Sequence, residues 1–99
     1  KYTNSRTGFE SYFLEFDTGT KIELMKMESI PENKNDKKRQ NLGLIHFAIS
    51  TGSREQVIAL TRKIKDNGYT ILSEPRETGD GYFESCILDP EGNRVEIVA

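Results

Sequence analysis

Three short segments of this chain alternate apolar with polar residues, and each has one carboxylate or imidazole at a polar position. The segments span residues 21–25, 44–50 and 94–98, and the polar residues in question are Glu23, His46 and Glu96. Successive side chains of a strand point to opposite faces of a sheet. If the apolar residues of each segment pack beneath helices, the three polar side chains all emerge on the other face of the sheet.

Two carboxylates and an imidazole on one concave surface suit a divalent metal ion that is bound through oxygen and nitrogen. Mixed sites of this kind accept several first-row ions, so nickel, cobalt, manganese and zinc all stay open. Each residue also has a simpler interpretation. His46 alone is equally typical of a core histidine with a satisfied ring, and Glu23 and Glu96 of strand carboxylates that face solvent. The shared alternation favours ligation for all three.

The length and charge of the chain limit both its fold and its partners. Ninety-nine residues suffice for one domain with a modest core, and an apolar content of 34% is ordinary for a globular chain. The formal net charge is −2 with acidic and basic residues mixed, so no positive field attracts nucleic acid or an anionic membrane. Small-molecule or protein partners are therefore expected, and among them a small-molecule substrate.

The single cysteine, Cys86, cannot form an internal disulfide, so a reducing cytoplasm is the expected compartment. It lies in an apolar run, where we predict a buried thiol that packs as a small hydrophobic group. No stretch has the length of a membrane span, and no charged and then apolar leader precedes a cleavage site. Because the chain begins at Lys1 and not at methionine, a processed or incompletely represented N-terminus is expected.

One helix is predicted at residues 54–67. Ser53 and Gln56 form a capping box at its start, and Gly68 is placed to end it. The residues that recur at helical spacing, and so define its buried face, are Val57, Leu60, Thr61 and Ile64. The strands that follow are expected at residues 69–74, 82–88 and 93–98. With the histidine strand before the helix, the order from residue 42 onward is β, α, β, β, β.

The first part of the chain resembles the end of that unit. Residues 13–25 match residues 86–98, because each contains a strand, a short turn with Asp and Gly, and a strand with one inward glutamate. Glu23 corresponds to Glu96, although the turn that begins at Asp17 reads as one residue shorter than its counterpart. We interpret the match as an internal repeat whose first copy lacks its opening strand and helix. Chance similarity between two short hairpins is the alternative.

The chain is accordingly divided into three parts. Residues 1–28 form the C-terminal hairpin of a truncated first module, residues 29–42 a polar linker, and residues 43–99 a complete second βαβββ module. The linker includes the basic run Lys37 to Arg39, which we interpret as part of a solvated connector. A nucleic-acid contact is disfavoured there, because acidic neighbours dilute the charge and no aromatic residue is interleaved.

Three motifs together resemble the second module of the vicinal oxygen chelate superfamily, which includes glyoxalase I, bleomycin-resistance proteins and ring-cleaving dioxygenases. They are GLIHFAIS at residues 43–50, TGDGYF at 78–83 and LDPEGNRVEIV at 88–98. The resemblance covers residues 42–99, and residues 9–27 resemble the last hairpin of the first module. It implies an α+β fold of paired βαβββ modules, with a curved mixed sheet and a helix on its outer face.

The resemblance also implies a ligand set. In the glyoxalase branch each module supplies one metal ligand from its first strand and one from its last. By position, His46 and Glu96 are similar to the two ligands of the second module, and Glu23 to the last-strand ligand of the first. The fourth ligand is expected upstream of Lys1. Extradiol dioxygenases need no glutamate at the Glu23 position, so its presence favours the glyoxalase type.

The function implied by this branch is that of a metal-dependent lyase or isomerase, similar to lactoylglutathione lyase, that acts on a small substrate chelating the metal through vicinal oxygens. The metal serves as a Lewis acid while a base removes a proton to give an enediolate. Glu96 is the first candidate for the base and Glu23 the second. Participation of glutathione or another thiol stays open, and the resemblance implies a homodimer.

Two alternatives remain from the sequence. The first is a non-catalytic binding protein of the bleomycin-resistance type, which encloses a small molecule or drug without reaction. The second is a partner subunit without activity of its own.

Two further polar features have open interpretations. Arg94 lies two residues before Glu96 in the predicted strand, so both side chains point to the same face. It either binds an anionic substrate group or pairs with a nearby acid. Residues 78–81 form either a mobile loop at the mouth of the pocket or an ordinary hairpin turn.

Overall fold

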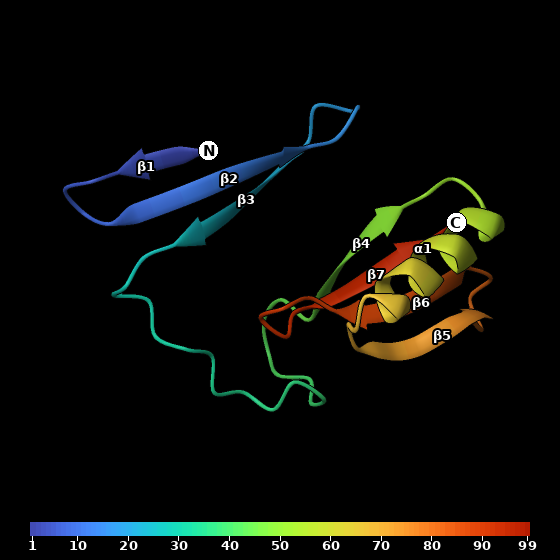
Figure 1. Cartoon of the computed structure of the whole chain (residues 1–99). Helices are drawn as coiled ribbons and strands as arrows, with labels where there is room; N and C mark the ends of the chain where they lie inside the picture. Colours follow the sequence, from blue (N-terminus) through green and yellow to red (C-terminus); the bar gives the residue numbers. More distant parts are fainter. The chain divides into compact units, whose positions relative to one another are not determined.

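The computed structural model describes all 99 residues and divides them into two compact units, Lys1–Lys34 and Asn35–Ala99 (Figure 1). The N-terminal unit holds a three-stranded antiparallel sheet in the order β1-β2-β3. Its strands are β1 (Tyr2–Asn4), β2 (Phe9–Glu15) and β3 (Lys21–Lys26). The β1 strand was not predicted from the sequence.

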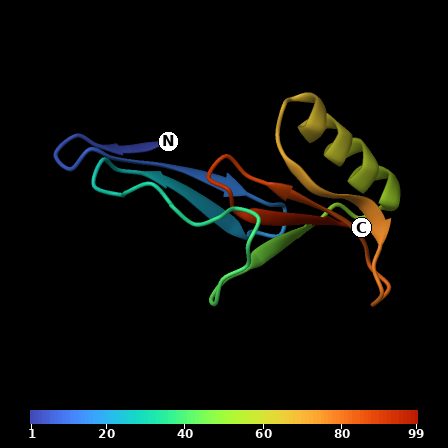
Figure 2. The ribbon, with the colours of Figure 1, turned by 90° about the horizontal axis from the view of Figure 1, so that it is seen from below.

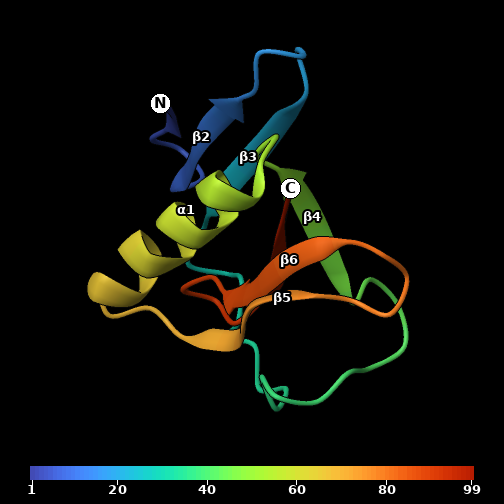
Figure 3. The same cartoon turned by 90° about the vertical axis from the view of Figure 1, so that its right-hand side faces the viewer.

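The C-terminal unit is a mixed four-stranded sheet, in the order β4-β7-β6-β5, with one helix. The β4 strand runs parallel to β7, whereas β6 is antiparallel to both of its neighbours. Figures 2 and 3 show the helix α1 lying over one face of this sheet. The elements are β4 (His46–Ser50), α1 (Arg54–Asp66), β5 (Ile71–Glu77), β6 (Phe83–Leu88) and β7 (Arg94–Val98). The predicted α+β class, with a βαβββ order and a helix on the outer face of a mixed sheet, is confirmed.

The helix α1 begins and ends where its capping residues predict. The Ser53 side chain accepts a hydrogen bond from the backbone N–H of Gln56 at 3.2 Å, which satisfies one of the free donors of the first turn. At the other end Gly68 adopts a φ of +86°, a conformation that costs a glycine little, and its N–H bonds to the carbonyl of Lys65. The helix has 13 residues, and no helix in the structure is both long and apolar enough to cross a membrane.

The core of the C-terminal unit lies between α1 and the sheet. Val57 of the helix is fully buried, and Val95 and Ile97 of β7 are at most 6% exposed. The predicted helix face is nevertheless narrower than expected, because Leu60 is 37% exposed whereas Thr61 is 1% exposed. The apolar residues of β7 therefore point at the helix, and the residues between them point away from it.

Two hydroxyl groups join the helix to the sheet inside this core. The Oγ1 of Thr61 lies 2.6 Å from the Oγ of Ser85 and 2.6 Å from the carbonyl oxygen of Val57. A threonine hydroxyl has one hydrogen, so if Thr61 donates to the Val57 carbonyl, Ser85 donates to Thr61. Thr61 and Ser85 are each at most 1% exposed. Because their hydroxyls bond to each other, neither is left as an unpaired polar group, which would be costly to bury.

Substitution of Ser85 by alanine is expected to lower the free energy of unfolding by about 1 kcal/mol, the usual net value of a buried hydrogen bond. Thr61 keeps its bond to Val57 in this variant, so the loss stays moderate. A double-mutant cycle of Ser85→Ala with Thr61→Val, followed by urea unfolding, isolates the coupling between the two hydroxyls. Strictly additive effects would show that the pair does not interact.

The two long hairpins of the chain have the same register. Phe13 pairs with Glu23 in β2-β3, and Cys86 pairs with Glu96 in β6-β7. All the remaining pairs between residues 11–15 and 21–25 likewise match pairs between residues 84–88 and 94–98, with the same shift in residue number. This shared register is a structural reason to interpret residues 1–26 as a copy of the β5-β6-β7 part of the C-terminal unit.

The turns of these hairpins are also equal in length, which corrects the expectation of a shorter first turn. In the first, the N–H of Phe16 bonds to the carbonyl of Thr20, and Gly19 has a φ of +83°. In the second, Asp89 bonds in the same way to Asn93, and Gly92 has a φ of +86°. Phe16 therefore occupies the position of Asp89. The first turn appears one residue shorter only if it is counted from Asp17, because the backbone equivalent of Asp89 is Phe16 and not Asp17.

The N-terminal unit leaves one apolar face of its sheet uncovered. Tyr12 and Leu24 pair across the hairpin, as do Leu14 and Ile22, so the four side chains share a face. Tyr12, Leu14 and Leu24 are each about half exposed, whereas the matching face of the other unit is covered by α1. No helix of this unit covers Ile22 and Leu24.

Candidate functional site

The site lies on the face of the four-stranded sheet that points away from α1. His46 begins β4 and is paired with Arg94, and two residues further along the parallel ladder Ala48 is paired with Glu96. The Nε2 of His46 lies 3.2 Å from the Oε2 of Glu96. The side chain of Glu96 is 21% exposed and that of His46 is 42% exposed, so both remain accessible to a small molecule or ion.

The spacing of these two atoms fits a shared metal ion. Metal–nitrogen and metal–oxygen bonds at zinc-type sites measure about 2.0–2.2 Å. Two such bonds place neighbouring donor atoms roughly 3.0 Å apart at an octahedral ion and roughly 3.4 Å apart at a tetrahedral ion. The observed distance between the His46 and Glu96 atoms lies between these values. The pair could therefore hold a divalent ion as it stands, with the imidazole neutral and the carboxylate ionised.

A second carboxylate on this face was missed by the sequence analysis. Glu84 is paired with Val98, which lies on the same face of β7 as Glu96. Burial, the nearby Glu96 and then Asp80 raise the pKa of Glu84, against the opposing effects of Arg76 and His46. The sequence contains a signal for this position. In the predicted strand Glu84 lies between Phe83 and Ser85, so its side chain points to the face opposite theirs.

This raised pKa predicts how Glu84 affects stability. A carboxyl whose pKa is higher in the folded than in the unfolded state stabilises the fold only while it is protonated. That contribution is complete below the ordinary pKa of 4.5 and is lost as the pH rises through the raised value. Glu84→Gln is therefore expected to raise the melting temperature at pH 7 and to change it little at pH 4. The opposite order in thermal unfolding would contradict the assignment.

Cys86 is not the buried core thiol that the sequence predicted. It is only partly buried, and it is the cross-strand partner of Glu96 on the polar face. Burial, followed by the charge of Glu96, raises the pKa of this thiol above its ordinary value. Its strand is apolar on the helix side alone, which is why composition by itself gave the wrong environment. A protonated thiol beside the His46–Glu96 pair is a weak nucleophile.

Glu23 lies in the N-terminal unit, on β3. It is exposed, and its cross-strand partner is Phe13, whose side chain is 57% exposed. The shared hairpin register gives Glu23 the position that Glu96 has in the other unit. Neither unit by itself brings together three His, Cys, Asp or Glu side chains that could hold a metal ion.

The structure also places the two polar features that had open interpretations. The Arg94 guanidinium donates a 2.7 Å hydrogen bond to the backbone carbonyl of Lys38 and forms no ion pair with an acid. Residues 78–82 form a hairpin turn in which the N–H of Thr78 bonds to the carbonyl of Tyr82 and Gly81 has a φ of +89°. An ordinary hairpin turn therefore accounts for this segment.

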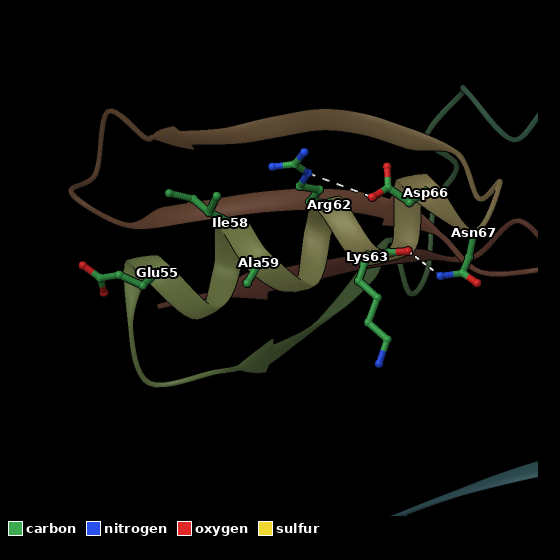
Figure 4. A pocket seen from close by; sticks show the side chains of 7 residues that line it. All are labelled: Glu55, Ile58, Ala59, Arg62, Lys63, Asp66 and Asn67. Atoms are coloured by element: carbon green, nitrogen blue, oxygen red, sulfur yellow. Dashed lines mark hydrogen bonds and ion pairs between the residues drawn. The ribbon is translucent and has the colours of Figure 1, made fainter.

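A shallow depression also exists on the outer surface of α1 (Figure 4). Its lining includes Ile58 and Ala59, and it is bordered by the Arg62–Asp66 ion pair. It lies on the opposite side of the sheet from His46, and its ionisable side chains are all exposed: Glu55, Arg62, Lys63 and Asp66. We therefore assign the site to the sheet face and not to this depression.

Comparisons with known proteins agree with this fold. The family model of the Glyoxalase/Bleomycin resistance protein/Dioxygenase superfamily matches residues 2–97. The chain therefore belongs to this superfamily, which confirms the resemblance drawn from the three motifs.

Individual relatives extend the comparison. The uncharacterized protein YqjT of Bacillus subtilis is 36% identical over 64 residues, which cover 62% of this chain and 50% of YqjT. Glyoxalase I from Zea mays is 25% identical with a TM-score of 0.74, over 94% of this chain and 32% of the maize protein. A glyoxylase/bleomycin resistance protein/dioxygenase domain from Frankia sp. EAN1pec shares the fold with a TM-score of 0.75 at 17% identity, over 97% of this chain and 72% of that one. The chain thus spans half the length of YqjT and about a third of the maize enzyme.

Proposed function

We propose that this protein is a metal-dependent lyase or isomerase of the glyoxalase type, acting on a small substrate that offers two vicinal oxygens. The observation that carries the proposal is the pair of donor atoms on His46 and Glu96, 3.2 Å apart on the accessible face of the sheet. The likeness to maize glyoxalase I, at 25% identity, supports the choice of this branch of the superfamily.

In this proposal His46, Glu96 and Glu23 hold a divalent ion, which is nickel, cobalt, manganese or zinc. Mixed imidazole and carboxylate donors suit all four ions. Glu23 is included because the hairpin register makes it the counterpart of Glu96 and because the glyoxalase branch uses a last-strand ligand from each module. When bound, the ion supplies Lewis acidity that favours negative charge on the substrate oxygens.

The chain's own residues supply the proton chemistry. Glu96 is the first candidate for the base, because its carboxylate is partly shielded from solvent and, when released from the ion or weakly held by it, can accept a proton from the carbon next to a carbonyl. Glu23, which is more exposed, is the second candidate for this role. Glutathione or another thiol is a candidate co-substrate. We further propose a cytoplasmic homodimer whose partner is a small molecule and not nucleic acid or a membrane.

Metal titration tests this proposal directly. Calorimetry with nickel, cobalt, manganese and zinc is expected to give stoichiometric binding of at least one ion, and His46→Ala is expected to weaken it by about 100-fold or more, since an outer-shell partner alone is worth 10–100-fold. A suitable control is Gln40→Ala, which changes an exposed polar residue of the connector.

The competing function is a non-catalytic binding protein of the bleomycin-resistance type. In that case no ion binds stoichiometrically, and binding of a small apolar ligand is unchanged by His46→Ala. That result would remove the enzyme proposal and leave the fold assignment intact.

A further inference from the structure

The connector before β4 is attached to the last hairpin at two points. We call residues 36–39 the strap. Its Lys38 carbonyl accepts the 2.7 Å hydrogen bond from Arg94, and the aliphatic part of Lys37 lies against Gly92. A Cβ at Gly92 would come within 2.6 Å of the Cδ of Lys37, so only glycine allows this contact without movement of the lysine chain. The strap is thus docked on the hairpin and is not a simple solvated linker.

Within the strap the chain is folded into a local turn. The N–H of Lys38 bonds to the Oδ1 of Asp36 at 2.9 Å, and the N–H of Arg39 bonds to the Asp36 carbonyl at 3.1 Å. These bonds are independent of Arg94, so the turn can keep its shape when it detaches. Its backbone is exposed, which leaves the contacts to Arg94 and Gly92 as its visible attachment to the hairpin.

Arg94 stands beside the candidate site. It is paired with His46 in the β4-β7 ladder and lies on the same face of β7 as Glu96. Its guanidinium has five donors in a fork that fits a carboxylate or phosphate with two parallel bonds. A backbone carbonyl is a neutral acceptor, whereas a carboxylate or phosphate carries the opposite charge and can accept two parallel bonds from the same guanidinium. The Lys38 carbonyl is therefore a partner that an anion can displace.

We propose that Arg94 is a specificity-determining residue that binds an anionic group of the substrate, and that the Lys38 carbonyl holds this position until the anion displaces it and frees the strap. The proposal rests on the proposed function only in placing a substrate on this sheet face. The ligand class is a small molecule with a carboxylate or phosphate group.

Detachment of the strap can be followed by trypsin cleavage, because Lys37, Lys38 and Arg39 are three consecutive trypsin sites. Cleavage of a docked segment requires local detachment, so its rate follows the population of the detached state. Arg94→Gln is expected to raise the rate of cleavage at residues 37–39 by about tenfold, because it removes a hydrogen bond from a charged donor. Arg94→Lys, which keeps the charge but loses the fork, is expected to give a smaller increase.

Inorganic phosphate serves as the anion probe, with chloride at matched ionic strength as its reference. In the unmodified protein, phosphate is expected to raise the cleavage rate at residues 37–39 at least about threefold, and in Arg94→Gln it is expected to have no further effect. Arg54→Gln is the matched control, since Arg54 pairs with Glu77 away from the strap. Circular dichroism confirms that each variant is folded before proteolysis.

Each outcome decides one part of the proposal. Unchanged cleavage in Arg94→Gln would overturn the tether, and faster cleavage in the variant without any phosphate effect in the unmodified protein would overturn anion displacement. Both measurements need neither metal nor turnover. They can therefore succeed if the metal proposal fails, and they can fail while metal still binds to His46 and Glu96.

Discussion

Replacement of Glu96 by glutamine is expected to lower the turnover of the proposed glyoxalase-type reaction, assayed as lactoylglutathione lyase activity, by a factor of about 10² to 10⁴, the usual contribution of a positioned acid or base. Glutamine keeps the shape and one acceptor oxygen of the side chain but cannot take up a proton at neutral pH. Glutamine matches glutamate in size, so it can occupy the position beside His46, where the Glu96 carboxylate lies 3.2 Å from the Nε2 atom in the unmodified protein. Steady-state kinetics at saturating metal separate the loss of the base from weaker metal binding.

The matched control is Glu91→Gln, which changes an exposed glutamate in the β6-β7 turn and is expected to leave turnover unaltered. Glu96→Asp keeps the carboxylate at a shorter reach and is expected to retain more activity than Glu96→Gln. If the glutamine variant keeps more than about a tenth of the turnover, Glu96 is not the base. The same substitution at Glu23 then becomes the decisive one.

Truncation of Ile97 to alanine is expected to lower the free energy of unfolding by about 2–5 kcal/mol. Ile97 is 2% exposed and lies in β7, between the helix-facing residues of the neighbouring strands, so its loss leaves a cavity under α1. The effect is large for a small unit, because the whole stability of a domain is only about 5–15 kcal/mol. Urea unfolding followed by circular dichroism measures the change.

Ile58→Ala is the control for this truncation. Ile58 is 50% exposed on the outer surface of α1, and its removal is expected to cost under about 1 kcal/mol, partly offset by the better helix propensity of alanine. Equal losses in the two variants would mean that the helix does not pack on β7 as described.

The sequence predicted the elements of the C-terminal unit because local signals and the alternation of its strands agree there. Ser53 and Gly68 mark the helix ends, and the alternating residues of β7 sort into a buried and a polar set. The helix end moved by one residue, and β5 extends to Glu77, beyond the predicted end at residue 74. Turn chemistry locates a strand end only to within a few residues.

Two side chains, Leu60 and Cys86, were predicted to be more buried than they are, because burial depends on the neighbouring elements as well as on the segment itself. Leu60 fits the helical spacing, but the stripe that meets the sheet is narrow, so it is more exposed than Thr61. Cys86 was assigned from the apolar character of its neighbours, although strand parity places it with Glu96. The same parity test would have found Glu84. Burial in a sheet depends on the face and not on the average composition of the segment.

The candidate site was predicted in part. The alternation of residues 44–50 and 94–98 was enough to place His46 and Glu96 on a common face, and the structure brings their side chains to 3.2 Å. The bond between Arg94 and Lys38 was not predictable, because a backbone carbonyl in a connector leaves no trace in residue type. The role of Glu23 remains a prediction from the repeat and from the superfamily.

The metal site is tested most directly by identifying the residues that surround a bound paramagnetic ion. On addition of one equivalent of Mn²⁺, we expect the backbone amide signals of Glu23, His46 and Glu96 to broaden together in nuclear magnetic resonance spectra, and His46→Ala to abolish the broadening at Glu23 and Glu96. Broadening of His46 and Glu96 with β3 unaffected would exclude Glu23 as a ligand. Absence of any selective broadening at one equivalent would contradict the metal site itself.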